Sequence, residues 1–435
     1  MTFLWFAGLF LILLTVLNEI YFVKSDFIKQ NSYSALLIHI LAALFVFICL
    51  LIVFHRIIFS AMITLGLHFL IIGIHHTKYQ SLKEGLVFSD IVMFSQAFKH
   101  PRLYFPFVKT WLLISFPTLI TLILIIALNL EPAVYFTSRL NKSLIYAAIN
   151  SILYFIIYQS AKKQTLRLDA NQDIKRFGLL ASMTISLLQA QQKFNRLALT
   201  NLLKKTPFSL LLKTQEINKK NPADLIVVQS ESFFDVRGLY PHIAADILQN
   251  YDKAKLESEQ FGNLNVSAWG ANTMRTEFSF LSGLINSQLG LFRYYPYHYI
   301  KTEVFSVAYY LKQQGYHTVC IHPYHADFFE RQRVFSLFGF DEFIDINGFS
   351  NAETFGSYIS DKAVTEKIIE LQTCSSKPLF IFAITMENHG PLHLESVSNA
   401  DDKFYQTKPD FDCHDLTVYL RHLQNADQMI ADLIA

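Results

Sequence analysis

The sequence predicts a protein of two parts: an α-helical membrane domain of five spans, followed by an α/β domain with a mostly parallel, doubly wound sheet. The first observation is composition. Hydrophobic residues make up 52% of the 435 residues and charged residues only 17%, and this composition is too apolar for a soluble enzyme. The second observation is distribution. Long apolar stretches lie in the first part of the chain, and short apolar runs alternate with helical patterns in the second.

The predicted membrane domain covers residues 1–161. It contains five apolar stretches, each close to the ~20 residues that cross the ~30 Å hydrocarbon core of a bilayer. They lie at residues 3–22, 35–54, 57–74, 111–130 and 144–161. The first stretch has no basic start and no small-residue cleavage site, so we interpret it as a retained span and not as a signal peptide. An odd number of spans would place the rest of the chain on the opposite side of the membrane from the N-terminus.

The loop at residues 75–110 argues against an outward-facing second part. With five spans and an inner N-terminus this loop would lie outside the cell, whereas the positive-inside rule places loops rich in basic residues in the cytoplasm. Its aromatic residues, Tyr104, Phe105 and Phe107, fit either a membrane-surface segment or a plain connector. The basic residues of the loop are Lys78, Lys83, Lys99, Arg102 and Lys109.

The second part of the chain divides at residue 222. Residues 162–221 have the apolar spacing of amphipathic helices, and we interpret them as a connector on or near the membrane. In residues 222–435, short apolar runs predict buried strands at 225–228, 318–321 and 379–384. Strands that alternate with helices predict a parallel sheet, and ligands of such sheets bind at the carboxyl ends of the strands.

Two candidate site residues follow from this rule and from a helix start. Glu231 directly follows the first predicted strand, where its carboxylate could bind a divalent cation or simply face solvent. Thr273 lies at the start of a helix predicted over 274–281. Free backbone N–H groups at a helix start favour negative charge, which suits a nucleophile and the phosphate it attacks. The plain alternative is that Thr273 only caps the helix.

Further candidates follow the other two predicted strands. The segment after the second strand contains Phe329 and Arg331. An arginine can clamp a phosphate through forked hydrogen bonds, and a phenylalanine can cover an apolar or glycerol face, although an isolated arginine is usually a surface residue. The third strand ends in a polar loop with His389, which fits a site or a structural role equally well.

The order of these elements resembles the lipoteichoic acid synthase and phosphoglycerol transferase family, within the alkaline phosphatase and sulfatase superfamily. The resemblance implies that Glu231 and Thr273 bind a catalytic manganese ion, or magnesium, and that Thr273 is the nucleophile. It also implies that Phe329, Arg331 and His389 contact the substrate.

The same resemblance implies a reaction and a location. Thr273 would take glycerol phosphate from phosphatidylglycerol or a similar phospholipid donor, and a glycan or polyol-phosphate acceptor would then receive it. The family places its catalytic domain outside the cytoplasm, anchored in the bacterial inner membrane, and we follow it against the loop charges. Basic residues are scattered at a net charge of +2, so the sequence predicts no nucleic-acid partner.

One family feature is missing from the sequence. The Asp-His pair that closes the family's metal site does not occur after Asn388, so we expect either a chain that stops before this pair or an inactive relative. Two alternatives to phosphoglycerol transfer remain. One is a phosphoethanolamine transferase, although the usual Gly-Glu-x-x-Arg signature is replaced here by Gln-Ser-Glu-Ser-Phe at 229–233. The other is a catalytically inactive membrane protein that binds a glycan.

Overall fold

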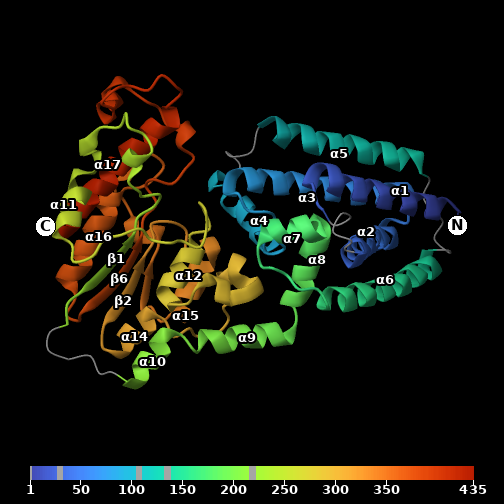
Figure 1. Cartoon of the computed structure of the whole chain (residues 1–435), viewed down its shortest axis with the longest axis horizontal. Helices are drawn as coiled ribbons and strands as arrows, with labels where there is room; N and C mark the ends of the chain where they lie inside the picture. The colour runs from blue at the N-terminus through green and yellow to red at the C-terminus, as the bar shows by residue number, and fades with distance from the viewer. Residues whose placement is uncertain (1, 27–32, 104–109, 132–138, 215–221) are drawn as a thin grey trace.

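The computed structural model describes residues 2–26, 33–103, 110–131, 139–214 and 222–435. Long helices that include the N-terminus form one part of the molecule, and a sheet covered by helices forms the other (Figure 1). Helices α8 and α9 lie between these two parts (Figure 1).

The first part is built from long apolar helices. They are α1 (Thr2–Asn18) with the π-helical turn η1 (Glu19–Val23), α2 (Tyr33–Phe54), α3 (Ile57–Leu82), α5 (Thr110–Leu130) and α6 (Arg139–Lys162). Four helical segments are long and apolar enough to cross a membrane, namely Leu4–Val23, Tyr33–Phe54, Ile57–Leu82 and Leu140–Lys162. Within α5 only a shorter apolar stretch, Ile120–Asn129, is found. Four predicted spans therefore have the required length and composition, whereas the span at 111–130, and with it the side of the membrane, stays a prediction.

The loop after α3 docks on the second part of the chain. It contains α4 (Ser89–Lys99) and the short helix η2 (Pro101–Leu103). Before α4, Glu84 forms an ion pair with Arg275 of the second part, at 2.7 Å. This contact ties the start of the loop to the second part of the chain. Its aromatic residues at 104–107 lie outside the described residues.

Four short helices connect the two parts. They are α7 (Ala170–Phe177), α8 (Leu179–Ala190), α9 (Lys193–Leu203) and α10 (Pro207–Thr214). The carboxylate of Glu19, which is fully buried, accepts the backbone N–H groups of Leu179 and Leu180 at 2.8 and 3.0 Å. These two N–H groups have no partner within their own helix, so Glu19 caps α8 and attaches it to η1.

The second part contains a parallel sheet of four strands in the order β1-β6-β2-β3. Its strands are β1 (Leu225–Gln229), β6 (Leu379–Ile384), β2 (His317–Ile321) and β3 (Glu342–Ile344). A separate antiparallel pair consists of β4 (Thr354–Phe355) and β5 (Tyr358–Ile359). The three predicted strands are thus the neighbours β1, β6 and β2, and their carboxyl ends meet at one edge of the sheet.

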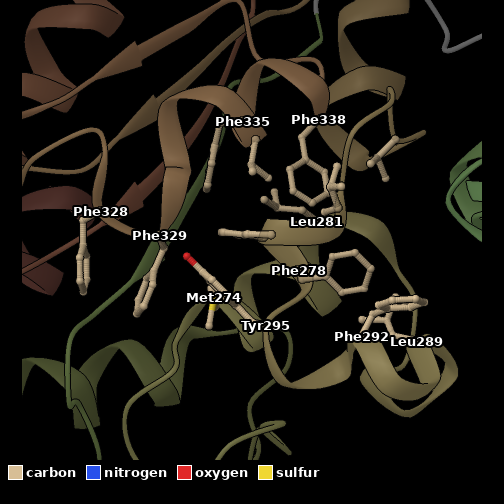
Figure 2. Close-up of a cluster of buried hydrophobic side chains, with 14 of the residues drawn as sticks. Met274, Phe278, Leu281, Leu289, Phe292, Tyr295, Phe328, Phe329, Phe335 and Phe338 are labelled. Carbon is tan, nitrogen blue, oxygen red and sulfur yellow. The ribbon is translucent and has the colours of Figure 1, made fainter. Parts of the chain in front are cut away.

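Helices cover both faces of this sheet. Alternate residues of β6 enter two different cores, since Phe380 and Phe382 belong to one buried cluster and Leu379 and Ile381 to another. The first cluster includes α12 (Met274–Ser282), α14 (Val307–Gln313) and α15 (Arg331–Leu337), and the second includes α16 (Asp361–Cys374) and α17 (His414–Ile434). Figure 2 shows how Phe278 and Leu281 of α12 face Phe335 and Phe338 in the first cluster. This burial on both sides explains why β6 reads as a continuous apolar run.

The remaining helices are short and lie mostly in the connections of the second part. They are η5 (Val236–Gly238), η6 (Ala245–Leu248), α11 (Gln249–Glu257), η7 (Asn286–Tyr294), α13 (Pro296–Tyr299), η8 (Phe328–Glu330), η9 (Ile346–Phe349), η10 (Leu392–Leu394) and η11 (Asn399–Phe404).

Candidate active site

Side chains at the carboxyl ends of β1, β6 and β2 form the floor of the candidate site. Glu231 follows β1, and its backbone N–H donates a hydrogen bond to the hydroxyl of Thr385, the first residue after β6, at 2.9 Å. His322 follows β2, and His389 lies in the loop after β6. The parallel register therefore brings together strand-end residues that lie far apart in the sequence.

Thr273 occupies the N-cap position of α12 but does not act as an ordinary cap. Among the described residues, its side chain accepts no capping bond from a backbone N–H. Its hydroxyl oxygen instead accepts a hydrogen bond from Nη2 of Arg331, at 3.3 Å. The plain N-cap interpretation therefore does not account for this side chain, which is half-buried beside a guanidinium group.

Arg331 is buried and held by Glu277. The side chains of these two residues are 2% and 0% exposed, and the guanidinium donates to both carboxylate oxygens, at 2.6 and 3.1 Å. The hydroxyl of Tyr297 also donates to Glu277, at 2.9 Å. Glu277 follows Thr273 by four residues, so both side chains lie on one face of the helix start. Nothing in the sequence near Glu277 indicates its partner, because Arg331 lies 54 residues away.

His322 completes the surroundings of Arg331. Its Nε2 lies 3.0 Å from Nη1 of Arg331, and its Nδ1 lies 3.2 Å from the carbonyl oxygen of Ile384. Because arginine can only donate, Nε2 is the acceptor and Nδ1 carries the hydrogen. Burial, followed by the positive charge of Arg331, holds the pKa of His322 well below its ordinary value. The imidazole is therefore neutral and orients the arginine from the side opposite Glu277.

Phe329 contacts the same guanidinium. Its ring centre lies 5.1 Å from Cζ of Arg331, within the range of a cation–π interaction. The ring is only 6% exposed and stacks on Phe328, as Figure 2 shows. Phe329 has a left-handed backbone, with φ of 56°, which is unusual for a phenylalanine and turns the chain just before Arg331. The structure thus places Phe329 against the arginine, and its contact with a substrate stays a prediction.

His389 lies near the site beside Tyr358. The two rings are 5.8 Å apart, and the hydroxyl of Tyr358 donates to the carbonyl oxygen of Gly390, at 3.1 Å. Burial raises the pKa of Tyr358 to about 12, so its hydroxyl stays protonated and able to donate at neutral pH. His389 is half-buried, and this exposure is compatible with the predicted contact to a substrate.

The described residues do not by themselves complete a metal site. Glu231 and Thr273 offer two oxygen ligands, whereas manganese or magnesium takes about six in an octahedral arrangement. In the part of the chain that the structure describes, no group of three or more His, Cys, Asp or Glu side chains could hold a metal ion. The buried oxygen Oδ1 of Asp361 has no hydrogen-bond partner among these residues. Burial, and then the charge of Glu387, raises the pKa of Asp361 to about 8.

Two relatives are similar in sequence, both from Rhizobium meliloti (strain 1021). The capsular polysaccharide biosynthesis protein RkpI is 25% identical over 403 residues, which cover 87% of this chain and 70% of that protein. A putative cyclic beta-1,2-glucan modification protein is 30% identical over 212 residues, which cover 48% of this chain and 32% of that protein. The chain therefore spans only about a third of the second relative.

The solved structures that are partly similar to this chain include a phosphoglycerol transferase and a lipoteichoic acid synthase. The phosphoglycerol transferase GacH of Streptococcus pyogenes is 24% identical, with a TM-score of 0.42, and the match covers 55% of this chain and 64% of GacH. The lipoteichoic acid synthase LtaP of Listeria monocytogenes is 23% identical, with a TM-score of 0.38, and the match covers 49% of this chain and 51% of LtaP.

A family model covers the whole second part. Residues 223–435 match the model described as sulfatase, from just before β1 through α17. This range holds the parallel sheet and all five predicted site residues. Residues 223–435 of this chain therefore form a sulfatase-family domain.

Proposed function

We propose that this protein is a membrane-anchored phosphoglycerol transferase. It moves glycerol phosphate from phosphatidylglycerol, through a covalent threonine intermediate, to a glycan or polyol-phosphate acceptor. One observation carries the proposal: the Thr273 hydroxyl, at the start of a helix, lies 3.3 Å from a guanidinium nitrogen that a buried carboxylate already holds in place. A phosphate attacked by Thr273 would meet Arg331 and the first N–H groups of α12 together.

The reaction needs two displacements at one phosphorus atom. In the first, Oγ1 of Thr273 bonds to the phosphorus, the bond to the diacylglycerol oxygen breaks, and the proton of the threonine ends on that leaving oxygen. In the second, an acceptor hydroxyl takes the phosphoryl group, the bond to Thr273 breaks, and the acceptor proton returns to Oγ1. Arg331 stabilises negative charge on the phosphoryl oxygens in both steps, while Phe329 and His389 bind the glycerol headgroup.

A divalent cation belongs to this proposal as a partner of Glu231 and Thr273. Manganese or magnesium would lower the pKa of the Thr273 hydroxyl. Because the described residues supply only two of its ligands, we assign it no step of the reaction. The cation can be tested without turnover, since Mn²⁺ bound at Glu231 would broaden the NMR signals of nearby groups, and Glu231→Gln would remove this effect.

The relatives support a glycan acceptor and an envelope location. One is described as a capsular polysaccharide biosynthesis protein and the other as a putative cyclic beta-1,2-glucan modification protein. A lipid donor explains why the domain is attached to apolar helices that could span a membrane. We place these helices in the inner membrane of a bacterium and the sulfatase-family domain outside the cytoplasm. A reporter fused after Ala435 should be active outside, and a cytoplasmic reporter would overturn this orientation.

The nucleophile can be tested with the full chain in lipid nanodiscs that contain labelled phosphatidylglycerol and Mn²⁺. Thr273→Ala should lower the release of diacylglycerol roughly 10³-fold or more, the scale seen when a catalytic nucleophile is removed. Thr276→Ala, one turn further on, is the matched control. Mass spectrometry should find glycerol phosphate on Thr273 when no acceptor is added. Retained release by Thr273→Ala would reject this residue as the nucleophile.

Two further outcomes separate the alternatives. Transfer from labelled phosphatidylethanolamine, with none from phosphatidylglycerol, would make the protein a phosphoethanolamine transferase. No release from either lipid by the unmodified chain would favour a non-catalytic glycan-binding protein. The absence of a three-ligand metal group among the described residues is the observation that keeps this second alternative in view.

A further inference from the structure

A cavity of about 450 Å³ lies where the two parts of the chain meet, lined in part by Asn272 and Arg275. Three segments that are distant in sequence line it: residues 82–84 at the end of α3, residues 167–172 around the start of α7, and residues 267–270 with Asn272 before α12. Residues Arg275, Arg293 and Tyr294 complete the lining. None of the residues that line this cavity was identified as part of a site from the sequence.

The cavity borders residues on both sides of the proposed nucleophile in the sequence. Asn272 precedes Thr273 and Arg275 follows it by two residues, and both line the cavity. The loop that leads to Thr273 is unusual, because Gly270, Ala271 and Asn272 all have left-handed φ angles, of 64°, 45° and 51°. Left-handed conformations of residues other than glycine persist where the surroundings enforce them, and they cluster at functional sites. A ligand in this cavity would therefore contact Asn272, the residue that precedes Thr273.

Trp269 supplies a flat apolar wall. It lines the cavity and is 66% exposed, so its indole ring is available to a ligand. An indole ring offers a large rigid apolar face at low entropic cost. The C–H groups on one face of a pyranose ring match such a surface, while the sugar hydroxyls around the rim need hydrogen-bonding partners.

Polar groups around the cavity supply such partners. The hydroxyl of Tyr294 is buried and has no hydrogen-bond partner among the described residues, which is costly unless a ligand or water satisfies it. The guanidinium of Arg293 donates to the carbonyl oxygen of Leu168 at 2.9 Å and has no carboxylate partner within the described part of the chain. Amide side chains also line the cavity, at Asn171, Gln172 and Asn272.

We propose that this cavity binds a saccharide, with one sugar ring stacked on Trp269 and its hydroxyls bonded to Tyr294 and the surrounding amides. Its role as the acceptor site rests on the proposed transferase function. In that role, a sugar hydroxyl attacks the phosphorus on Thr273, the bond from phosphorus to Oγ1 breaks, and the sugar proton passes to Oγ1. Basic side chains outnumber acidic ones around the cavity, so it also accepts saccharides that already carry acidic groups. They are Lys83, Arg167, Arg275 and Arg293 against Glu84 and Asp169.

Binding can be measured without turnover, because the chain has only three tryptophans. The substitutions Trp5→Phe and Trp111→Phe leave Trp269 as the single fluorescent tryptophan. Titration with cyclic β-1,2-glucan should then change the fluorescence of Trp269 saturably. The substitution Tyr294→Phe should raise the Kd several-fold. Phe261→Ala removes an exposed aromatic ring outside the cavity and should leave the Kd unchanged. Saturation by phosphatidylglycerol vesicles and not by the glucan would overturn the proposal, because the cavity would then hold a lipid headgroup.

The acceptor role needs a kinetic test in nanodiscs with labelled phosphatidylglycerol. Trp269→Ala should raise the acceptor KM at least tenfold with a much smaller change in kcat, and Trp269→Phe should recover most of this loss. An unchanged acceptor KM would reject the cavity as the acceptor site. If the glucan binds but the unmodified chain releases no diacylglycerol, the transferase function fails while the saccharide site stands.

Discussion

Glu277 and Arg331 form an ion pair that is almost completely excluded from water. The guanidinium nitrogen Nη2 lies 2.6 Å from the carboxylate, and the side chains are 2% exposed for the arginine and 0% for the glutamate. The pair joins α12, which begins just after Thr273, to α15, which begins at Arg331. It therefore fixes the distance between the proposed nucleophile and the group that would bind its phosphate.

Removal of the charge of Glu277 should lower the free energy of unfolding. Glu277→Gln leaves the guanidinium buried without its counter-charge, and breaking a buried pair in this way costs about 3–5 kcal/mol of unfolding free energy. Chemical unfolding of the full chain in detergent would measure the loss. Glu257→Gln, at the exposed end of α11, neutralises a carboxylate without a buried partner and should change the unfolding free energy by less than about 0.5 kcal/mol. Equal effects of the two substitutions would contradict this account.

The ion pair also shows what the sequence could and could not provide. Strand β6 is predictable because a strand buried on both faces is apolar throughout, β1 and β2 are predictable from shorter apolar runs, and α12 is predictable from the turn residues before it. Strand β3 has only three residues, too few for a periodic pattern. Neither Glu277 nor His322 could be assigned as a partner of Arg331, because that contact depends on how α12 packs against β2 and α15. Local signals specify elements, whereas the site depends on long-range packing.

The docking of the loop after α3 could not be predicted from the sequence for a similar reason. In the sequence, the basic residues of the loop at 75–110 indicate only on which side of the membrane the loop lies. In the structure, Lys78 lies 2.8 Å from Glu84, and Glu84 lies 2.7 Å from Arg275. A sequence does not show whether a charged residue pairs within its own segment or with another domain. Only the fold distinguishes the two cases.

The pair of Glu84 and Arg275 should make stability depend on acid pH. Burial alone would raise the pKa of Glu84, but hydrogen bonds and positive charge from Arg275 and Lys78 outweigh it and lower the pKa to about 2. A carboxyl pKa below the unfolded value of 4.5 stabilises the fold above pH 4.5, and this contribution is lost as the pH falls through 2. Glu84→Gln should therefore cost about 3 kcal/mol at pH 7 and progressively less below pH 4.5. Thermal unfolding across this pH range would measure both, and a pH-independent cost would contradict the assignment.

A second contact between the two parts should contribute little. Lys99 and Asp327 lie 3.1 Å apart, but their side chains are 56% and 52% exposed. Solvent screens such a pair, and exposed pairs are worth about 1 kcal/mol or less. Lys99→Ala should therefore leave the melting temperature nearly unchanged at physiological salt, in contrast to Glu84→Gln. A loss comparable to that of Glu84→Gln would mean that the docking depends on this contact more than its exposure indicates.

Asp361 should have the opposite pH dependence to Glu84. Burial, and then the negative charge of Glu387, raises its pKa from 3.8 to about 8, so the folded protein binds a proton that the unfolded chain releases. Stability is then lost as the pH rises from 3.8 through 8. Asp361→Asn keeps the shape but cannot ionise, so without divalent cations the variant should gain stability relative to the unmodified chain between pH 5 and 9.

Melting temperatures at these two pH values would measure this gain. Asp432→Asn, at an exposed carboxylate of α17, is the matched control and should show no such trend. Addition of Mn²⁺ makes the test sharper, because Asp361 lies close enough to Glu231 to feel its charge. A cation bound at Glu231 would favour the ionised form of Asp361, so the advantage of the asparagine at pH 9 should shrink when Mn²⁺ is added. An advantage that stays the same with Mn²⁺ would argue against a cation at Glu231.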